Sequence, residues 1–76
     1  MNPELMVHKA NQIALYFASF PPEEGIAGIA DHLQKFWEPR MRRQILAYVA
    51  NGGSGLHELV PPAVEILRES ESARAS

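Results

Sequence analysis

Apolar residues recur every three or four positions in four successive segments of the chain, which is the period of an amphipathic helix. Proline and glycine separate the segments. No segment alternates apolar and polar residues with the period of two that a half-buried strand requires, and no internal repeat is present. The pattern predicts an all-α fold, a small compact array of three main helices plus a short C-terminal helix.

Prolines bound the first two predicted helices. Asn2 can cap the first helix, and Pro3 occupies its first position, where the missing N–H is not needed. Pro21 and Pro22 end that helix, because proline removes a hydrogen-bond donor and clashes with the preceding turn. The second helix begins at Pro22 and is expected to run to about Phe36.

Small residues interrupt the apolar stripe of the second predicted helix. Gly25, Ala27 and Gly28 permit close approach of another backbone, so their expected role is packing. Asp31 and Lys35 are four residues apart with the acid first, an arrangement that supports an exposed helix by roughly 0.2–0.5 kcal/mol. Neither feature predicts a chemical site.

The boundaries of the last two helices also follow from proline and glycine. A turn before Pro39 starts the third helix, and the run Asn51-Gly52-Gly53 offers residues with positive φ for its C-terminal cap. The pair Pro61-Pro62 interrupts any continuous helix, so the last helix is expected to be short, from about Pro62 to Arg68.

The chain has 76 residues, a net charge of −2 and no cysteine. This length predicts one domain, residues 1–68, followed by a flexible tail of Ser, Ala and charged residues at 69–76. Without cysteine there can be no disulfide and no thiolate ligand, which favours a reducing compartment. No apolar run approaches the length of a membrane span, and the N-terminus lacks a leader pattern, so we expect a soluble, cytoplasmic protein without membrane contact.

Residue types that could carry chemistry are present but scattered. His8, His32 and His57 are more than twenty residues apart and lack the i, i+4 pairing of a helical metal site. The serines have no neighbouring base, so no catalytic triad is predicted. The glycine-rich loop 52–55 lacks the Lys and Ser/Thr of a nucleotide loop and follows a helix, which is typical of a helix stop. We expect no catalytic, cofactor-binding or metal-binding residue on this chain.

Residues 32–43 are unusual, because they contain the only Trp and four of the seven Lys and Arg residues. These four are Lys35, Arg40, Arg42 and Arg43. Positive charge at the start of a helix opposes the helix dipole, so an acid of the same chain or of a partner is expected to compensate. Trp and Arg are also enriched at the energetic centres of interfaces.

Two other interpretations of this stretch remain open. In one, Phe36 and Trp37 belong to the core and the arginines form a solvated face. In the other, the basic residues of a stand-alone helical module recognise nucleic acid or another anionic surface. The net acidic charge and the presence of Glu38 within the patch weigh against nucleic acid.

The run from Ala30 to Arg42, with its core KFWEPRMR, resembles the delta subunit of NAD-dependent formate dehydrogenases. Ala10 to Ala14 before it, and Gly52-Gly53 and Gly55-Leu56 after it, extend the resemblance over about residues 7 to 68. The resemblance implies a non-catalytic accessory subunit of a cytoplasmic, molybdenum-dependent complex that oxidises formate and reduces NAD.

The same resemblance implies where the cofactors of such a complex lie. The alpha subunit holds bis-molybdopterin guanine dinucleotide and iron-sulfur clusters, the beta subunit holds FMN and the NAD site, and the gamma subunit carries a further cluster. The delta subunit carries no redox centre, and a cysteine-free chain has no thiolates for an iron-sulfur cluster. Its implied role is assembly, stabilisation or cofactor insertion.

From these observations we expect docking on the large alpha subunit through the corner between the second and third helices. The expected contacts are Trp37, Arg40 and Arg43, with Lys35 at the rim. Phe36 and Met41 are expected to hold the corner from inside. No independent enzyme is predicted, because no nucleophile, base and orienting group lie at compatible spacing.

Overall fold

The structure, a computed structural model, describes residues 2–75, with side chains described as far as Ala73. Four helices make up this part of the chain, in the order α1 (Pro3–Phe17), α2 (Pro22–Phe36), α3 (Pro39–Ala50) and α4 (Val60–Ala75). No strand is present in the described residues. The prediction of an all-α fold is confirmed, as are the starts of the first three helices.

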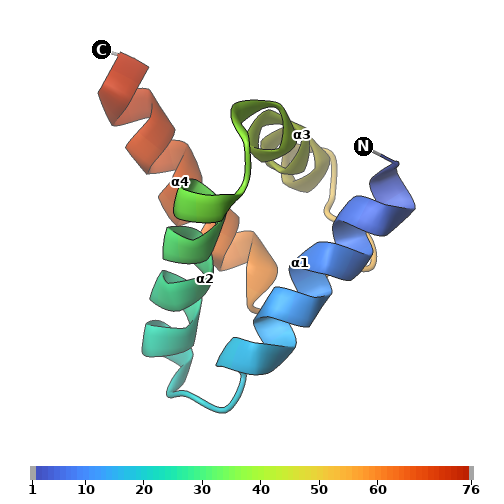
Figure 1. The fold of residues 1–76 in the computed structure, drawn as a ribbon, viewed down its shortest axis with the longest axis vertical. Helices are drawn as coiled ribbons and strands as arrows, with labels where there is room; N and C mark the ends of the chain where they lie inside the picture. The colour runs from blue at the N-terminus through green and yellow to red at the C-terminus, as the bar shows by residue number, and fades with distance from the viewer. Residues whose placement is uncertain (1, 76) are drawn as a thin grey trace.

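The helices α1 and α2 form two arms that meet at their connecting loop, and α4 starts beside α1 and passes behind α2 (Figure 1). The third helix, α3, lies at the opposite end of the molecule from this loop. Each of the other three helices packs against α4, and α1 also packs against α2. The C-terminal helix is therefore the centre of the fold and not an appendage.

The core forms because α4 presents apolar side chains with helical spacing on one face. Buried side chains from all four helices meet there: Met6, Ala10 and Ala14 from α1, Ile29, Ala30 and Leu33 from α2, Ile45 from α3, and Val60, Ala63, Val64 and Leu67 from α4, together with Trp37 from the turn. Burying each large aliphatic side chain contributes about 1.5–3 kcal/mol to folding.

The α1–α2 contact depends on the absence of a side chain at Gly25. A Cβ atom at this position would lie 2.7 Å from the carbonyl oxygen of Phe17, which is backbone and cannot move aside. A Cβ atom at Gly28 would meet the Phe17 ring instead. The packing role expected for the small residues of this helix is confirmed at both glycines.

Local hydrogen bonds explain where α1 begins and α3 ends. The Oδ1 atom of Asn2 accepts a hydrogen bond of 2.7 Å from the backbone N–H of Glu4, which is a side-chain N-cap. After α3, Gly52 and Gly53 adopt positive φ values of 117° and 62°. The N–H of Gly53 donates to the carbonyl of Tyr48, so the predicted glycine cap is confirmed.

The prediction for the last helix is wrong at both ends. The helix α4 begins at Val60, and Pro61 and Pro62 lie in its first turn, where a backbone N–H has no partner within the helix in any case. It continues past Arg68 to Ala75, so residues 69–75 are helical rather than a tail, and Ser76 lies outside the described residues. An ion pair at Glu71, described below, connects this last part to α3.

Asn11 fixes the connection between α3 and α4. Its Nδ2 atom donates to the carbonyl of Gly55 at 3.0 Å, and its Oδ1 atom accepts from the N–H of His57 at 2.8 Å. The Nδ1 atom of His57 then accepts from the N–H of Leu59 just before α4. One side chain of α1 thus holds a loop more than forty residues away in sequence.

Candidate interaction surface

The turn between α2 and α3 is built around Trp37. The residue ends α2 in an extended conformation, with φ −87° and ψ 135°, and its N–H still donates to the carbonyl of Leu33. Only 7% of Trp37 is exposed, and the ring belongs to the core. Pro39 then starts α3 two residues later.

The two aromatic residues at this corner differ in exposure. Phe36 is 72% exposed, so the expectation that it lies inside is wrong, and Trp37, which we expect to contact a partner, has only 7% of its surface exposed. The reason is helical periodicity: Ile29, Leu33 and Trp37 follow one another at intervals of four on the buried face. Phe36 instead follows His32 on a neighbouring face, with 4.8 Å between the ring centroids. Met41 packs against the core, as expected.

Arg42 is an internal connector between helices. Its side chain is 13% exposed, and its Nε atom donates to Oε1 of Glu71 on α4 at 2.7 Å. Its Nη1 atom donates to the carbonyl of Trp37 and, at 3.3 Å, to that of Gln34. These carbonyls lie at the end of α2, where no helical N–H is left to bond them. The acid of the same chain that was expected to compensate Arg42 is therefore Glu71.

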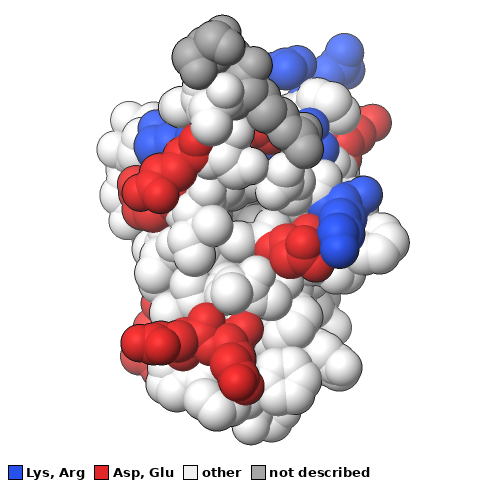
Figure 2. Space-filling model, turned by 90° about the vertical axis from the view of Figure 1, so that its left-hand side faces the viewer, with Lys and Arg blue, Asp and Glu red and all other residues white. Residues whose placement is uncertain are grey.

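The other basic residues of the corner differ from Arg42. The side chains of Arg40 and Arg43 are exposed and make no hydrogen bond or ion pair with the described part of the chain. Lys35 is paired with Asp31 at 3.1 Å, as predicted, with both side chains well exposed. On the face shown in Figure 2, basic side chains lie in the upper part, and acidic side chains alone mark the lower end. Within the part of the chain that the structure describes, two of the four cations at the corner, Arg40 and Arg43, therefore have no acidic partner.

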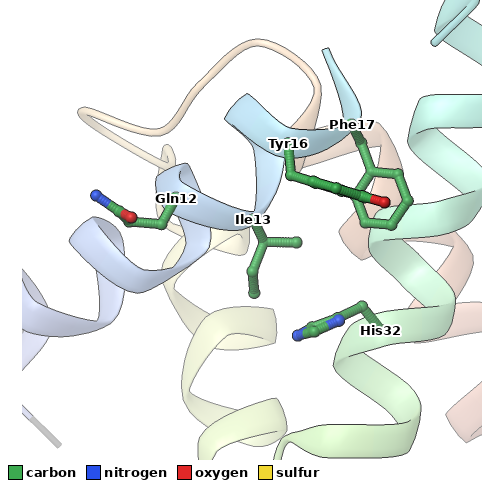
Figure 3. A pocket seen from close by; sticks show the side chains of 5 residues that line it. All are labelled: Gln12, Ile13, Tyr16, Phe17 and His32. Atoms are coloured by element: carbon green, nitrogen blue, oxygen red, sulfur yellow. The ribbon is translucent and has the colours of Figure 1, made fainter. Parts of the chain in front are cut away.

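A shallow apolar groove runs between α1 and α2. One section, of about 380 Å³, is lined by Gln12, Ile13, Tyr16, Phe17 and His32. In Figure 3, Ile13 from α1 and His32 from α2 point toward one another across it, and the ring of Tyr16 extends toward that of Phe17.

The second section of the groove, of about 480 Å³, lies farther toward the start of α1. Its lining consists of Leu5, His8, Lys9, Gln12, Ile13 and Trp37. The small exposed part of Trp37 therefore faces this groove. Gln12 and Ile13 line both sections, so the two form one continuous groove along α1.

Large apolar side chains are exposed beside the groove. Tyr16 is 67% exposed, and its ring meets those of Phe17 and Phe20 at 4.9 and 5.8 Å between centroids. The sequence carried one signal of this surface, since α1 has more apolar positions than one buried face can accommodate and its stripe ends in aromatic residues. Periodicity alone could not show which of these positions remain exposed, and sequence reasoning did not single out the groove.

The described residues bring no set of candidate metal ligands together. No cluster of three or more His, Asp or Glu side chains among them is placed to hold a metal ion. In the glycine-rich loop, the Tyr48 hydroxyl donates to the carbonyl of Ser54 at 2.6 Å, which closes the loop against its own helix. The donor set also does not fit an iron-sulfur cluster, because the sequence contains no cysteine. No helix of residues 2–75 is long and apolar enough to cross a membrane.

The fold and the groove define a small all-α domain whose distinctive surface is apolar. The family model of the NADH-dependent formate dehydrogenase delta subunit, FdsD, matches residues 6–64. The chain therefore belongs to the family of formate dehydrogenase delta subunits. Comparison with curated proteins and with solved structures found no match.

Proposed function

We propose that this chain is a non-catalytic accessory subunit of a cytoplasmic, NAD-dependent molybdenum formate dehydrogenase. In this proposal it docks on the large alpha subunit, in a complex that also contains beta and gamma subunits, and it binds neither nucleic acid nor a membrane. Its family supports a place in such a complex, since a delta subunit implies protein partners.

The observation that carries the docking proposal is the amount of exposed apolar surface on so small a domain. Among the residues whose side chains are described, six large apolar ones are exposed: Leu5, Leu15, Tyr16, Phe20, Phe36 and Ile66. Exposed apolar patches on soluble domains mark contact surfaces, and two of these side chains, Leu5 and Tyr16, line the groove along α1. At the adjoining corner, Lys35, Arg40 and Arg43 stay our proposed polar contacts, and Trp37 contributes only through its edge at the groove.

The chain would act through binding free energy rather than chemistry. The complex is proposed to use bis-molybdopterin guanine dinucleotide, iron-sulfur clusters and FMN, all held by the other subunits. A protein that binds only the folded form of a partner stabilises it by RT ln(1 + [L]/Kd), about 2.7 kcal/mol when its concentration is one hundred times Kd. Preferential binding to a cofactor-competent conformation would favour that conformation in the same way.

Producing the other subunits with and without this chain tests the proposal. We expect the complex made without it to show lower formate-dependent NAD reduction and a lower molybdenum content per alpha subunit. Supplying the wild-type chain should restore both quantities, whereas Leu33→Asp, which places a charge in the core, should restore neither. Equal activity and equal molybdenum content without the chain would contradict the proposal.

A further inference from the structure

The groove along α1 has the dimensions of a helix-binding site. Leu5, Lys9, Ile13 and Tyr16 line it at intervals of four, four and three residues, which places them on one face of α1. At 1.5 Å per residue, this row is about 16 Å long, or roughly three helical turns. His32 and Trp37 contribute the opposite wall.

The charges in and beside the groove are complementary to an acidic partner. No carboxylate lines either section, although the whole chain is acidic, and Lys9 is the one charged side chain among the described residues of the lining. Lys9 makes no ion pair with the described residues, and neither do Arg40 and Arg43, which follow Trp37 by three and six residues in the sequence. By contrast, Lys35, Arg42 and Arg68 each have an acidic partner within the chain, as the salt bridges show.

We propose that this groove binds an amphipathic helix of another subunit, whose apolar stripe is flanked by carboxylates. This inference rests on the proposed function, and it specifies which face of the chain contacts the other subunit and what kind of segment that subunit contributes. An amphipathic helix fills a groove between two helices with apolar residues at positions i, i+3 or i+4, and i+7, which matches a groove of three turns. Its carboxylates would pair with Lys9 in the lining of the groove.

A second copy of this chain fits the groove less well. The exposed face of α4 carries Glu65 and Glu69, so it has the acidic character that the groove calls for. However, Ile66 is the one large exposed apolar side chain on that face among the described residues. A single anchor cannot fill both sections of the groove.

Two variants on the same helix test whether binding depends on the groove or on any exposed apolar side chain. Tyr16 lines the groove and Leu15 does not, yet they are 67% and 63% exposed. The full chain is titrated into purified complex that was assembled without it. We expect Tyr16→Lys to weaken binding by roughly tenfold or more and Leu15→Lys by less than about twofold. Circular dichroism of both variants checks that they remain folded.

The charge argument has its own variant, Lys9→Glu. We expect it to weaken binding to the same complex by roughly tenfold, and to reduce the salt dependence of binding that the wild-type chain shows. The affinity of the neutral variant Lys9→Gln should lie between those of the wild-type chain and Lys9→Glu. Binding of Lys9→Glu at wild-type strength would overturn the acidic character of the proposed partner helix.

A photo-crosslinking residue, p-benzoylphenylalanine, at position 16 of the full chain then identifies the occupant in the assembled complex. A crosslink to a helical, acid-flanked apolar segment of another subunit supports the inference. A crosslink to a second copy of this chain, or to a segment without carboxylates, overturns it. If the wild-type chain and Tyr16→Lys bind the complex equally well, the groove is not the docking surface, and the chain docks through another surface. If wild-type chain does not bind the complex, the proposed function itself fails.

Discussion

The guanidinium group of Arg42 connects three helices at once. It starts on α3, bonds carbonyls at the end of α2 and pairs with Glu71 on α4. Because it is largely buried, its removal would leave these carbonyls without a donor, and an unsatisfied group of this kind costs about 1–3 kcal/mol. The ion pair with Glu71 is partly solvated, so it contributes less to stability than the hydrogen bonds to the carbonyls.

We therefore predict that Arg42→Ala lowers the free energy of unfolding by about 1–3 kcal/mol. Arg43→Ala is the matched control, because this neighbouring arginine is exposed and makes no bond within the described chain, and it should change stability by less than about 0.5 kcal/mol. Urea unfolding followed by circular dichroism at 222 nm measures both. Equal losses for the two variants would show that Arg42 is not a connector.

The positions of single side chains were less predictable from the sequence than the helices or the fold class. It singled out the corner that contains Trp37, Arg40 and Arg42, but it did not predict the direction of each side chain. Trp37 continues the buried i, i+4 series one residue beyond the end of α2, and Phe36 turns out to solvent. The partner of Arg42 is 29 residues away on a helix whose last part the apolar pattern did not predict.

At the level of helices, Gly25 matters because it has no side chain, which allows α1 and α2 to pack closely. Replacing a helical Gly by Ala normally stabilises a helix by about 1 kcal/mol. At Gly25 the new Cβ atom would stand 2.7 Å from the backbone oxygen of Phe17, and separating the two requires α1 and α2 to move apart.

We predict that Gly25→Ala lowers the free energy of unfolding by about 1–3 kcal/mol in spite of its better helix propensity. Gly28→Ala should cost less, since its Cβ atom would meet the Phe17 ring, a side chain that can rotate. Thermal unfolding of both variants against the wild-type chain provides the comparison. A Gly25→Ala variant more stable than wild type would refute the close α1–α2 packing.

Helix boundaries were predictable where local chemistry decides them. Proline starts three of the helices, Asn2 caps α1, and glycines with positive φ end α3. The boundaries of α4 were not predictable, because Pro61-Pro62 is compatible with either a break or a first turn. Its extension beyond Arg68 contains no large apolar residue and joins α3 through Glu71, a contact that local pattern does not contain.

For the whole molecule, the all-α class followed from periodicity, and the resemblance to formate dehydrogenase delta subunits is confirmed by the family match. The groove was not predicted, because it depends on how α1 and α2 diverge around α4 and on which apolar residues are left outside (Figure 1). The exposed apolar groove of this small domain is the basis of our proposal that it docks on a larger protein.

Affinity purification through a tag on the C-terminal end of the chain, away from the groove, tests the central claim most directly. The chains that co-purify from its native cell are identified by mass spectrometry, and the molybdenum content of the eluate is measured. We predict recovery of the large, molybdenum-containing subunit of a formate dehydrogenase with the wild-type chain. A chain that elutes alone, or only with copies of itself, would contradict the claim.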